Sequence, residues 1–133
     1  MKFMLDTNIC IYVIKKKPRQ VLDHFQKTKP GDVGISTITL SELMYGVEKS
    51  QRKRQNRLAL LQFLATLEIV PYDALAAEHY GVIRSELERA GQPIGALDML
   101  IAAHARSLNL TVVTNNVKEF SRVPALKIAN WAS

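Results

Sequence analysis

The chain has 133 residues, which fits one domain over residues 1–133. With 47% hydrophobic and 23% charged residues it has the composition of a globular protein, and no apolar stretch approaches the ~18 residues that a membrane-spanning helix needs. The formal charge of +6 and the pI near 9.6 favour a polyanionic partner such as nucleic acid, because binding releases counterions.

Strands and helices alternate along the chain. Apolar runs bounded by polar residues predict short strands, and apolar positions at helical spacing predict helices. The predicted strands cover residues 2–6, 33–37, 69–70, 110–113 and 126–129, and the predicted helices cover residues 7–14, 19–27, 40–48, 52–67, 74–90 and 98–108. This alternation favours an α/β fold with a parallel sheet and right-handed crossovers.

The first strand ends on a charge at Asp6, before the apolar core of a signal peptide can form. We therefore expect a cytoplasmic protein. The single cysteine, Cys10, cannot form an internal disulfide and lacks the partners of a structural zinc site. It is expected to be a small buried apolar residue.

Basic residues gather in two segments. They are Lys15, Lys16, Lys17 and Arg19 in the first, and Lys49, Arg52, Lys53, Arg54 and Arg57 in the second. For any single residue, a solvated helix face explains the charge better. As groups, they make Lys15, Lys16, Arg52, Lys53 and Arg54 candidate contacts to the phosphates of a nucleic acid.

Three acidic residues, Asp6, Glu42 and Asp98, each lie where a strand or a loop gives way to a helix. Helix capping is one explanation: Asp6 can cap the helix at 7–14, Thr39 and Glu42 fit a capping box, and Asp98 suits a first helical turn. A shared site is the other, because the ends of parallel strands converge on one edge of the sheet. For each residue alone, both explanations stay open.

Carboxylates that share a crevice repel one another unless a cation neutralises them, and Mg²⁺ accepts oxygen ligands while keeping several waters. The segment after the strand at 110–113 adds Thr114, Asn115, Asn116 and Glu119 beside the same edge. Asn116 and Glu119 are candidates for holding metal-bound water or a second, weaker ion. The alternative is an asparagine-rich turn followed by a helical start.

The remaining titratable residues indicate no further site. His24, His79 and His104 lack the spacing of metal ligands, and no serine stands in a nucleophile-elbow pattern. His104 lies on an apolar helix and is expected to be a core or interface histidine.

Four short motifs follow one another along essentially the whole chain. They are Met4–Asn8, Ser41–Gly46, Pro93-Ile94-Gly95 leading to Asp98, and Thr114–Asn116 followed by Glu119-Phe120. In this order and spacing they resemble the PIN-domain ribonucleases and, more closely, the VapC toxins of bacterial type II toxin–antitoxin pairs. The resemblance implies a PIN-like three-layer sandwich, in which helices flank a central, mostly parallel twisted sheet of four to five strands.

The resemblance also implies an endoribonuclease that depends on Mg²⁺ or Mn²⁺. Asp6, Glu42 and Asp98 would form its metal-binding core, with Glu119 as the fourth acidic member of the catalytic set. Where many PIN domains carry a further aspartate this chain has Asn116, which weakens the expectation of a second tightly bound metal. The implied supporting residues are Thr7, Asn8 and Thr114.

Partners follow from the same resemblance. Toxins of this family are held in check by a VapB-type antitoxin whose C-terminal segment covers the acidic site. They commonly form homodimers and, with antitoxin, larger complexes on operator DNA, with no membrane partner. Their substrates are structured RNAs, often tRNA in the anticodon region, and the toxins most like this chain resemble those that act on initiator tRNA. The implied effect is inhibition of translation and growth.

Two other functions compete with this one. A non-catalytic PIN-like module that binds RNA or a protein, with its acidic residues acting as helix caps, stays open. A structure-specific DNA nuclease of the flap type would need extra DNA-gripping helices, for which a chain of 133 residues has no room.

Overall fold

The computed structural model describes all residues from Met1 to Ser133. In chain order the elements are β1 (Phe3–Leu5), α1 (Thr7–Lys15), α2 (Arg19–Lys27), β2 (Val33–Ser36), α3 (Thr37–Glu48), α4 (Lys53–Leu64), β3 (Glu68–Val70), α5 (Ala74–Arg89), α6 (Ala96–Ser107), β4 (Thr111–Val113), α7 (Val117–Phe120) and β5 (Lys127–Ala129). The alternation of strands and helices is therefore as predicted. None of the helices is both long enough and apolar enough to span a bilayer.

The strands form one sheet in the order β3-β2-β1-β4-β5, and every neighbouring pair is parallel. The predicted α/β fold with a parallel sheet of four to five strands is confirmed. Strand β1 lies in the centre of the sheet. Because all the strands run in one direction, the residues that follow β1, β2 and β4 meet at one edge of the sheet.

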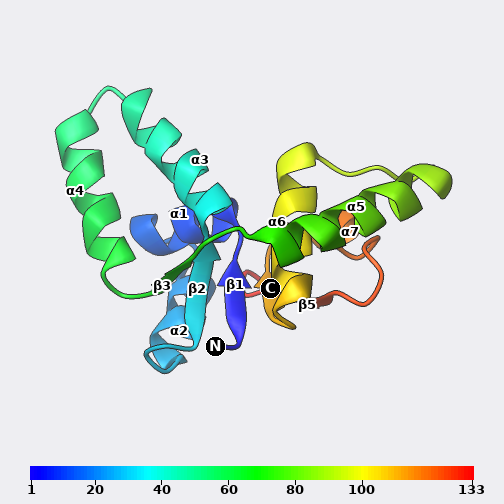
Figure 1. Cartoon of the computed structure of the whole chain (residues 1–133). Coiled ribbons are helices and arrows are strands. Elements are labelled where there is room, and N and C mark those ends of the chain that lie inside the picture. Colours follow the sequence, from blue (N-terminus) through cyan, green and yellow to red (C-terminus); the bar gives the residue numbers. More distant parts are fainter.

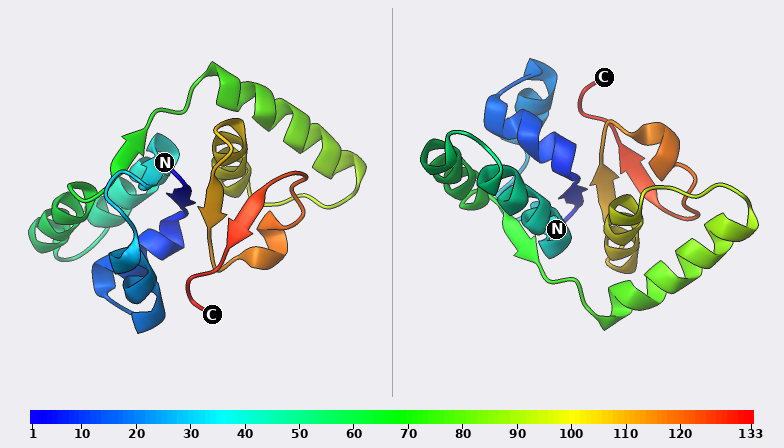
Figure 2. Two further views of the ribbon diagram at one scale, coloured as in Figure 1. Left: turned by 90° about the horizontal axis from the view of Figure 1, so that it is seen from below. Right: turned by 90° about the horizontal axis from the view of Figure 1, so that it is seen from above.

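Helices cover both faces of the sheet. Met4 and Leu5 point to opposite faces, as neighbouring residues of a strand do. Met4 packs in a core with residues of α5, α6 and α7, and Leu5 packs in a second core with residues of α1 to α4. Figures 1 and 2 show these two groups of helices on opposite sides of the strands, which confirms the three-layer sandwich.

The starts of α3 and α6 differ from those predicted, whereas α1, α2 and α5 begin where the sequence predicted. Helix α3 begins at Thr37, three residues early, because the Ser36 hydroxyl accepts a hydrogen bond from the Ile38 N–H at 3.0 Å and caps the helix there. The capping box with Glu42 is therefore wrong. Helix α6 begins at Ala96 rather than at Asp98, so Asp98 lies in its first turn.

Candidate active site

Asp6 lies directly after the central strand, and it is 4% exposed. Its carboxylate accepts a hydrogen bond from the Ile9 N–H at 2.9 Å and one from the Thr114 hydroxyl at 2.5 Å. Burial raises the pKa of Asp6, and the charge of Glu42 adds to the rise, whereas these two hydrogen bonds lower it. Asp6 is thus a helix cap, as one explanation held, and it also faces other acidic residues.

Glu42 lies in the second turn of α3 and is half-buried. Its Oε1 accepts a hydrogen bond from the Thr7 hydroxyl at 2.6 Å. Thr7 follows Asp6 directly and begins α1. This contact therefore holds Glu42 beside the carboxyl end of β1, as the convergence of strand ends predicted.

Asp98 and Glu119 are joined through Asn116. The side-chain amide of Asn116 donates to Asp98 Oδ2 at 3.3 Å and to Glu119 Oε2 at 3.1 Å. The Asn116 N–H in turn donates to the hydroxyl of Thr114 at 2.9 Å. In this arrangement Asn116 is a hydrogen-bond donor between two carboxylates, which reduces their mutual repulsion.

The four carboxylates act on one another electrostatically. Burial raises the pKa of Asp98 to about 6, and the charges of Asp6, Glu119 and Glu42 contribute to the rise, while the hydrogen bond from Asn116 lowers it. The structure therefore brings Asp6, Glu42, Asp98 and Glu119 together, and these four residues are called the acidic cluster.

No basic side chain forms a salt bridge with the acidic cluster. No three His, Cys, Asp or Glu side chains stand close enough together to hold a metal ion by themselves. Mg²⁺ usually contacts only one or two carboxylates and keeps several waters. A donor set made only of carboxylate oxygens fits a hydrated hard cation and does not fit structural zinc, which takes sulfur and imidazole ligands.

The predicted supporting residues differ in their contacts. Thr7 and Thr114 each donate a hydroxyl to a carboxylate of the acidic cluster. Asn8 is exposed, and only its backbone N–H acts on Asp6. Asn115 turns away from the cluster and donates to the Tyr12 hydroxyl at 2.8 Å, a contact across 103 residues that no local pattern in the sequence indicated.

Comparison with known proteins identifies the family. The sequence profile of the PIN domain matches residues 3–126. The chain belongs to the PIN domain family. This PIN domain protein is 48% identical to the tRNA(fMet)-specific endonuclease VapC of Shigella flexneri, over 99% of each chain.

Solved structures agree with this assignment. The PIN domain protein superposes on a chain of the DNA-bound VapBC complex from Salmonella typhimurium with a TM-score of 0.93 and 47% identity, over 98% of each chain. It superposes on a chain of VapBC2 from Rickettsia felis, bound to a DNA fragment from its promoter, with a TM-score of 0.91 and 46% identity, over 98% and 99% of the two chains.

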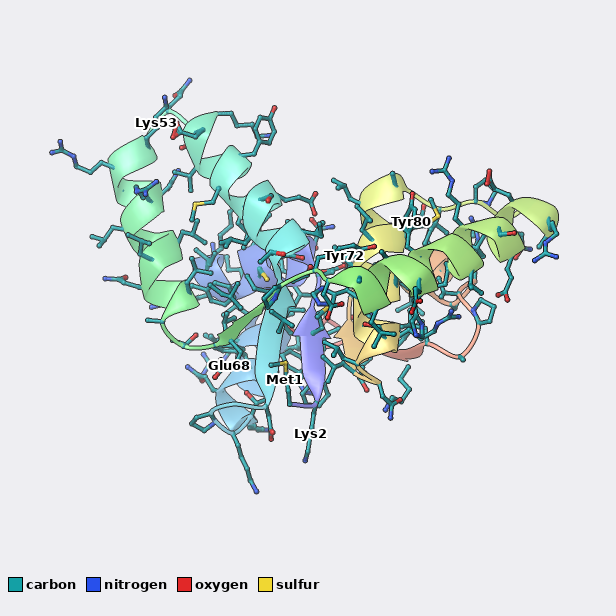
Figure 3. The ribbon with its side chains drawn as sticks, viewed as in Figure 1. Met1, Lys2, Lys53, Glu68, Tyr72 and Tyr80 are labelled. Carbon is teal, nitrogen blue, oxygen red and sulfur yellow. The ribbon has the colours of Figure 1, made fainter.

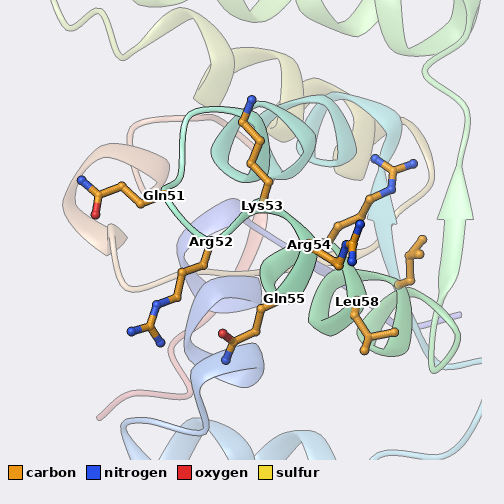
Figure 4. A pocket seen from close by; sticks show the side chains of 8 residues that line it. Gln51, Arg52, Lys53, Arg54, Gln55 and Leu58 are labelled. Carbon is orange, nitrogen blue, oxygen red and sulfur yellow. The ribbon is translucent and has the colours of Figure 1, made fainter.

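The predicted basic residues of the PIN domain lie in different places. Arg52, Lys53 and Arg54 line an open cavity of about 800 Å³ at the start of α4, together with Arg57 (Figure 4). This cavity contains no residue of the acidic cluster. The other predicted basic residues are on α1: Lys15 lines a second cavity of about 360 Å³ that Glu42 also lines, and Lys16 is exposed at the end of the helix.

The raised pKa of Asp98 predicts that the difference in stability between the wild type and Asp98→Asn depends on pH. An unperturbed aspartate has a pKa of 3.8, whereas the pKa of Asp98 in the folded chain is about 6, so ionised Asp98 disfavours the folded state. Without metal, the free energy of unfolding of the wild type falls as the pH rises from about 4 to about 6, because Asp98 ionises more readily in the unfolded chain than in the folded one. We expect Asp98→Asn, which cannot ionise, to have the higher Tm at neutral pH and no advantage below about pH 4.

Thermal unfolding in EDTA between about pH 4 and about pH 8 measures this difference. A gap between the two Tm values that is the same at every pH would contradict the raised pKa of Asp98.

Proposed function

We propose that this PIN domain protein is the toxin of a type II toxin–antitoxin pair. It is an endoribonuclease that needs Mg²⁺ or Mn²⁺, cuts tRNA in the anticodon region and so inhibits translation and growth. Initiator tRNA is the proposed substrate. The observation that carries this proposal is a cluster of four carboxylates that no basic side chain pairs with, in a chain 48% identical over nearly its full length to a tRNA(fMet)-specific endonuclease.

The acidic cluster supplies the chemistry. Asp6, Glu42 and Asp98 would hold the metal, in part through its bound waters, with Glu119 as a weaker, more peripheral ligand. When bound, a divalent cation acidifies a water and stabilises the charge that develops on the scissile phosphate.

Three further polar residues orient these carboxylates. Thr7 holds Glu42 and Thr114 holds Asp6, each through its hydroxyl. Asn116 holds Asp98 and Glu119 through one amide. Hydrogen bonds of this kind fix the direction of a carboxylate's lone pairs, and residues that make them are needed for tight metal binding.

The exposed basic residues would bind the RNA backbone. Arg52 and Arg54 have no acidic partner within salt-bridge distance, and Lys53 has only an exposed pair with Glu48 at 3.6 Å. Such side chains are free to contact phosphates, which position an RNA without reading its sequence. Lys15 and Lys16 on α1 would contact phosphates nearer to the scissile bond, because Lys15 lines the same cavity as Glu42.

The proposed partners follow from the relatives, whose structures are of VapBC complexes bound to DNA. We propose a VapB-type antitoxin that covers the acidic cluster, a toxin homodimer, and a larger complex with antitoxin on operator DNA. Residues 1–133 would act as one domain, in the cytoplasm.

The alternative is a PIN module that binds RNA or a protein without cutting. The hydrogen bond from Ile9 to Asp6 favours it, because a helix cap needs no catalytic role. Incubating the purified protein with total RNA and Mg²⁺, and mapping the new 5′ ends, decides between the two. We expect one group of cuts in the anticodon region of initiator tRNA.

Elongator methionine tRNA provides the matched control, since it has the same anticodon in a different tRNA body. If both tRNAs were cut equally, the protein would recognise only the anticodon loop and not the tRNA body. Scattered ends throughout total RNA would contradict a tRNA-specific toxin, and the absence of any new ends would favour the binding module.

A further inference from the structure

A buried hydrogen bond joins two parts of the protein that lie far apart in the sequence. His104 Nδ1 on α6 lies 2.8 Å from the Ser36 hydroxyl oxygen at the end of β2, across 68 residues. His104 is 1% exposed and Ser36 is 0% exposed. His104 is therefore a core histidine, as expected, but it has a specific polar partner.

The Ser36 hydroxyl contacts both Ile38 and His104. Its oxygen accepts the Ile38 N–H and lies within hydrogen-bond distance of His104 Nδ1. Because a hydroxyl can donate one hydrogen bond and accept two, Ser36 can pair with either tautomer of the neutral ring. Burial lowers the pKa of His104, which keeps the ring neutral, although Asp73 and the backbone of Pro71 act in the opposite direction.

The linker between β3 and α5 packs against the same bond. The Tyr72 ring meets the His104 ring edge to face, with centroids 5.4 Å apart. The Tyr72 N–H donates to the Thr37 hydroxyl at 3.1 Å, directly beside Ser36. Figure 3 shows Tyr72 where this linker passes between the two groups of helices. The surroundings of His104 thus leave little room for α6 to slide against α3.

Each partner of this hydrogen bond is six residues away in the sequence from a member of the acidic cluster. Ser36 is six residues before Glu42 on α3, and His104 is six residues after Asp98 on α6. At 1.5 Å per residue, each helix segment is about 9 Å long. The bond therefore joins two rigid segments of similar length, each of which carries a carboxylate at its other end.

We propose that the hydrogen bond between His104 and Ser36 sets the separation of Glu42 and Asp98, which makes His104 a positioning residue for the candidate active site. A hydrogen bond has a preferred length and direction, so it restrains both sliding and rotation of one helix against the other, which apolar packing restrains less. A shift of 1 Å in a catalytic group can cost about 100-fold in rate. The inference rests on the proposed function in assigning metal binding to these carboxylates.

Mn²⁺ binding to the RNA-free protein tests this inference. We expect His104→Leu, which keeps the apolar volume and removes the ring nitrogen, to weaken Mn²⁺ binding about tenfold or more. Ser36→Ala, which also removes the cap of α3, should weaken it at least as much. The double variant should bind no more weakly than Ser36→Ala, since both changes remove the same bond between the two residues. His104→Asn should restore most of the affinity, because its side-chain amide can accept from or donate to the Ser36 hydroxyl.

The control variant is Ile83→Val, which removes a methyl group from a fully buried residue of α5 and lowers stability without touching the bond. It should bind Mn²⁺ as the wild type does. Equal Mn²⁺ affinity in His104→Leu and wild type would overturn the inference. So would equal weakening in Ile83→Val, no recovery in His104→Asn, or a wild type that binds no Mn²⁺. If His104→Leu does not fold, Ser36→Ala and His104→Asn still decide.

Cleavage kinetics separate this inference from the proposed function. The inference predicts a lower kcat for His104→Leu and an unchanged KM for tRNA, because the basic residues are elsewhere. Altered Mn²⁺ binding in a protein that cuts no RNA would support the positioning role and refute the nuclease. RNA cleavage by the wild type, together with unaltered Mn²⁺ binding in His104→Leu, would support the nuclease and refute the positioning role.

Discussion

Replacing Asp98 or Asp6 with asparagine is expected to abolish RNA cleavage and to leave the fold intact. The loss should exceed the ~10–100-fold that is typical of residues that only support a metal ligand. Each change removes a negative charge from the acidic cluster, with which no basic side chain forms a salt bridge. The measurement is the rate of cutting of initiator tRNA at saturating Mg²⁺.

The fold should survive both substitutions for different reasons. Asparagine is as good a helix cap as aspartate, so the amide oxygen of Asp6→Asn still accepts the Ile9 N–H. Its NH2 group replaces the oxygen that accepts the Thr114 hydroxyl, and it can donate to that hydroxyl instead. Asp98→Asn removes a charge that burial and its neighbours disfavour. Glu78→Gln, an exposed change on α5, makes the same change of charge outside the cluster and should cut at the wild-type rate. Wild-type rates in Asp6→Asn or Asp98→Asn would exclude the proposed site.

Removing divalent cations is expected to have the second large effect. With EDTA, cleavage should fall to background, and Mg²⁺ or Mn²⁺ should restore it. The reason is that four carboxylates share one edge of the sheet, where burial and their charges raise the pKa of Asp98 to about 6. A cation relieves this repulsion and supplies the positive charge that phosphate hydrolysis requires.

Thermal unfolding provides a second measurement that does not depend on RNA. A ligand that binds only the folded state raises the free energy of unfolding, by about 2.7 kcal/mol at 100 times its Kd, and therefore raises the Tm. Mg²⁺ should therefore raise the Tm of the wild type and have little effect on Asp98→Asn. Cleavage that persists in EDTA would refute the metal-dependent mechanism, and a protein that binds RNA with no cleavage under either condition would be the non-catalytic module.

Much of the fold could be predicted from local patterns. The start of α3 could not, because Ser36 and Thr39 are both suitable caps for this helix, and the choice depends on where β2 ends. The apolar run from Val33 continues the strand only as far as Ser36, whose side chain turns back to cap the helix. Local sequence could not distinguish these possibilities, since the end of β2 is defined by its pairing with β1 and β3.

The site was predictable to the extent that it depends on strand ends. Asp6 and Thr114 follow two neighbouring parallel strands, so their contact follows from the topology. The bridging role of Asn116 was not predictable, since it depends on the angle at which α7 leaves the sheet. Nor was the bond between His104 and Ser36, because 68 residues separate its two partners.

The sequence by itself determined the order of elements and the parallel sheet, because these follow from hydrophobic spacing. Its motifs indicated the four acidic residues through their resemblance to PIN domains. Only the tertiary structure decided how the acidic residues are held. Thr7, Thr114, Asn116 and the bond between His104 and Ser36 contribute through contacts between elements, and such contacts depend on strand order and helix packing that no local pattern specifies.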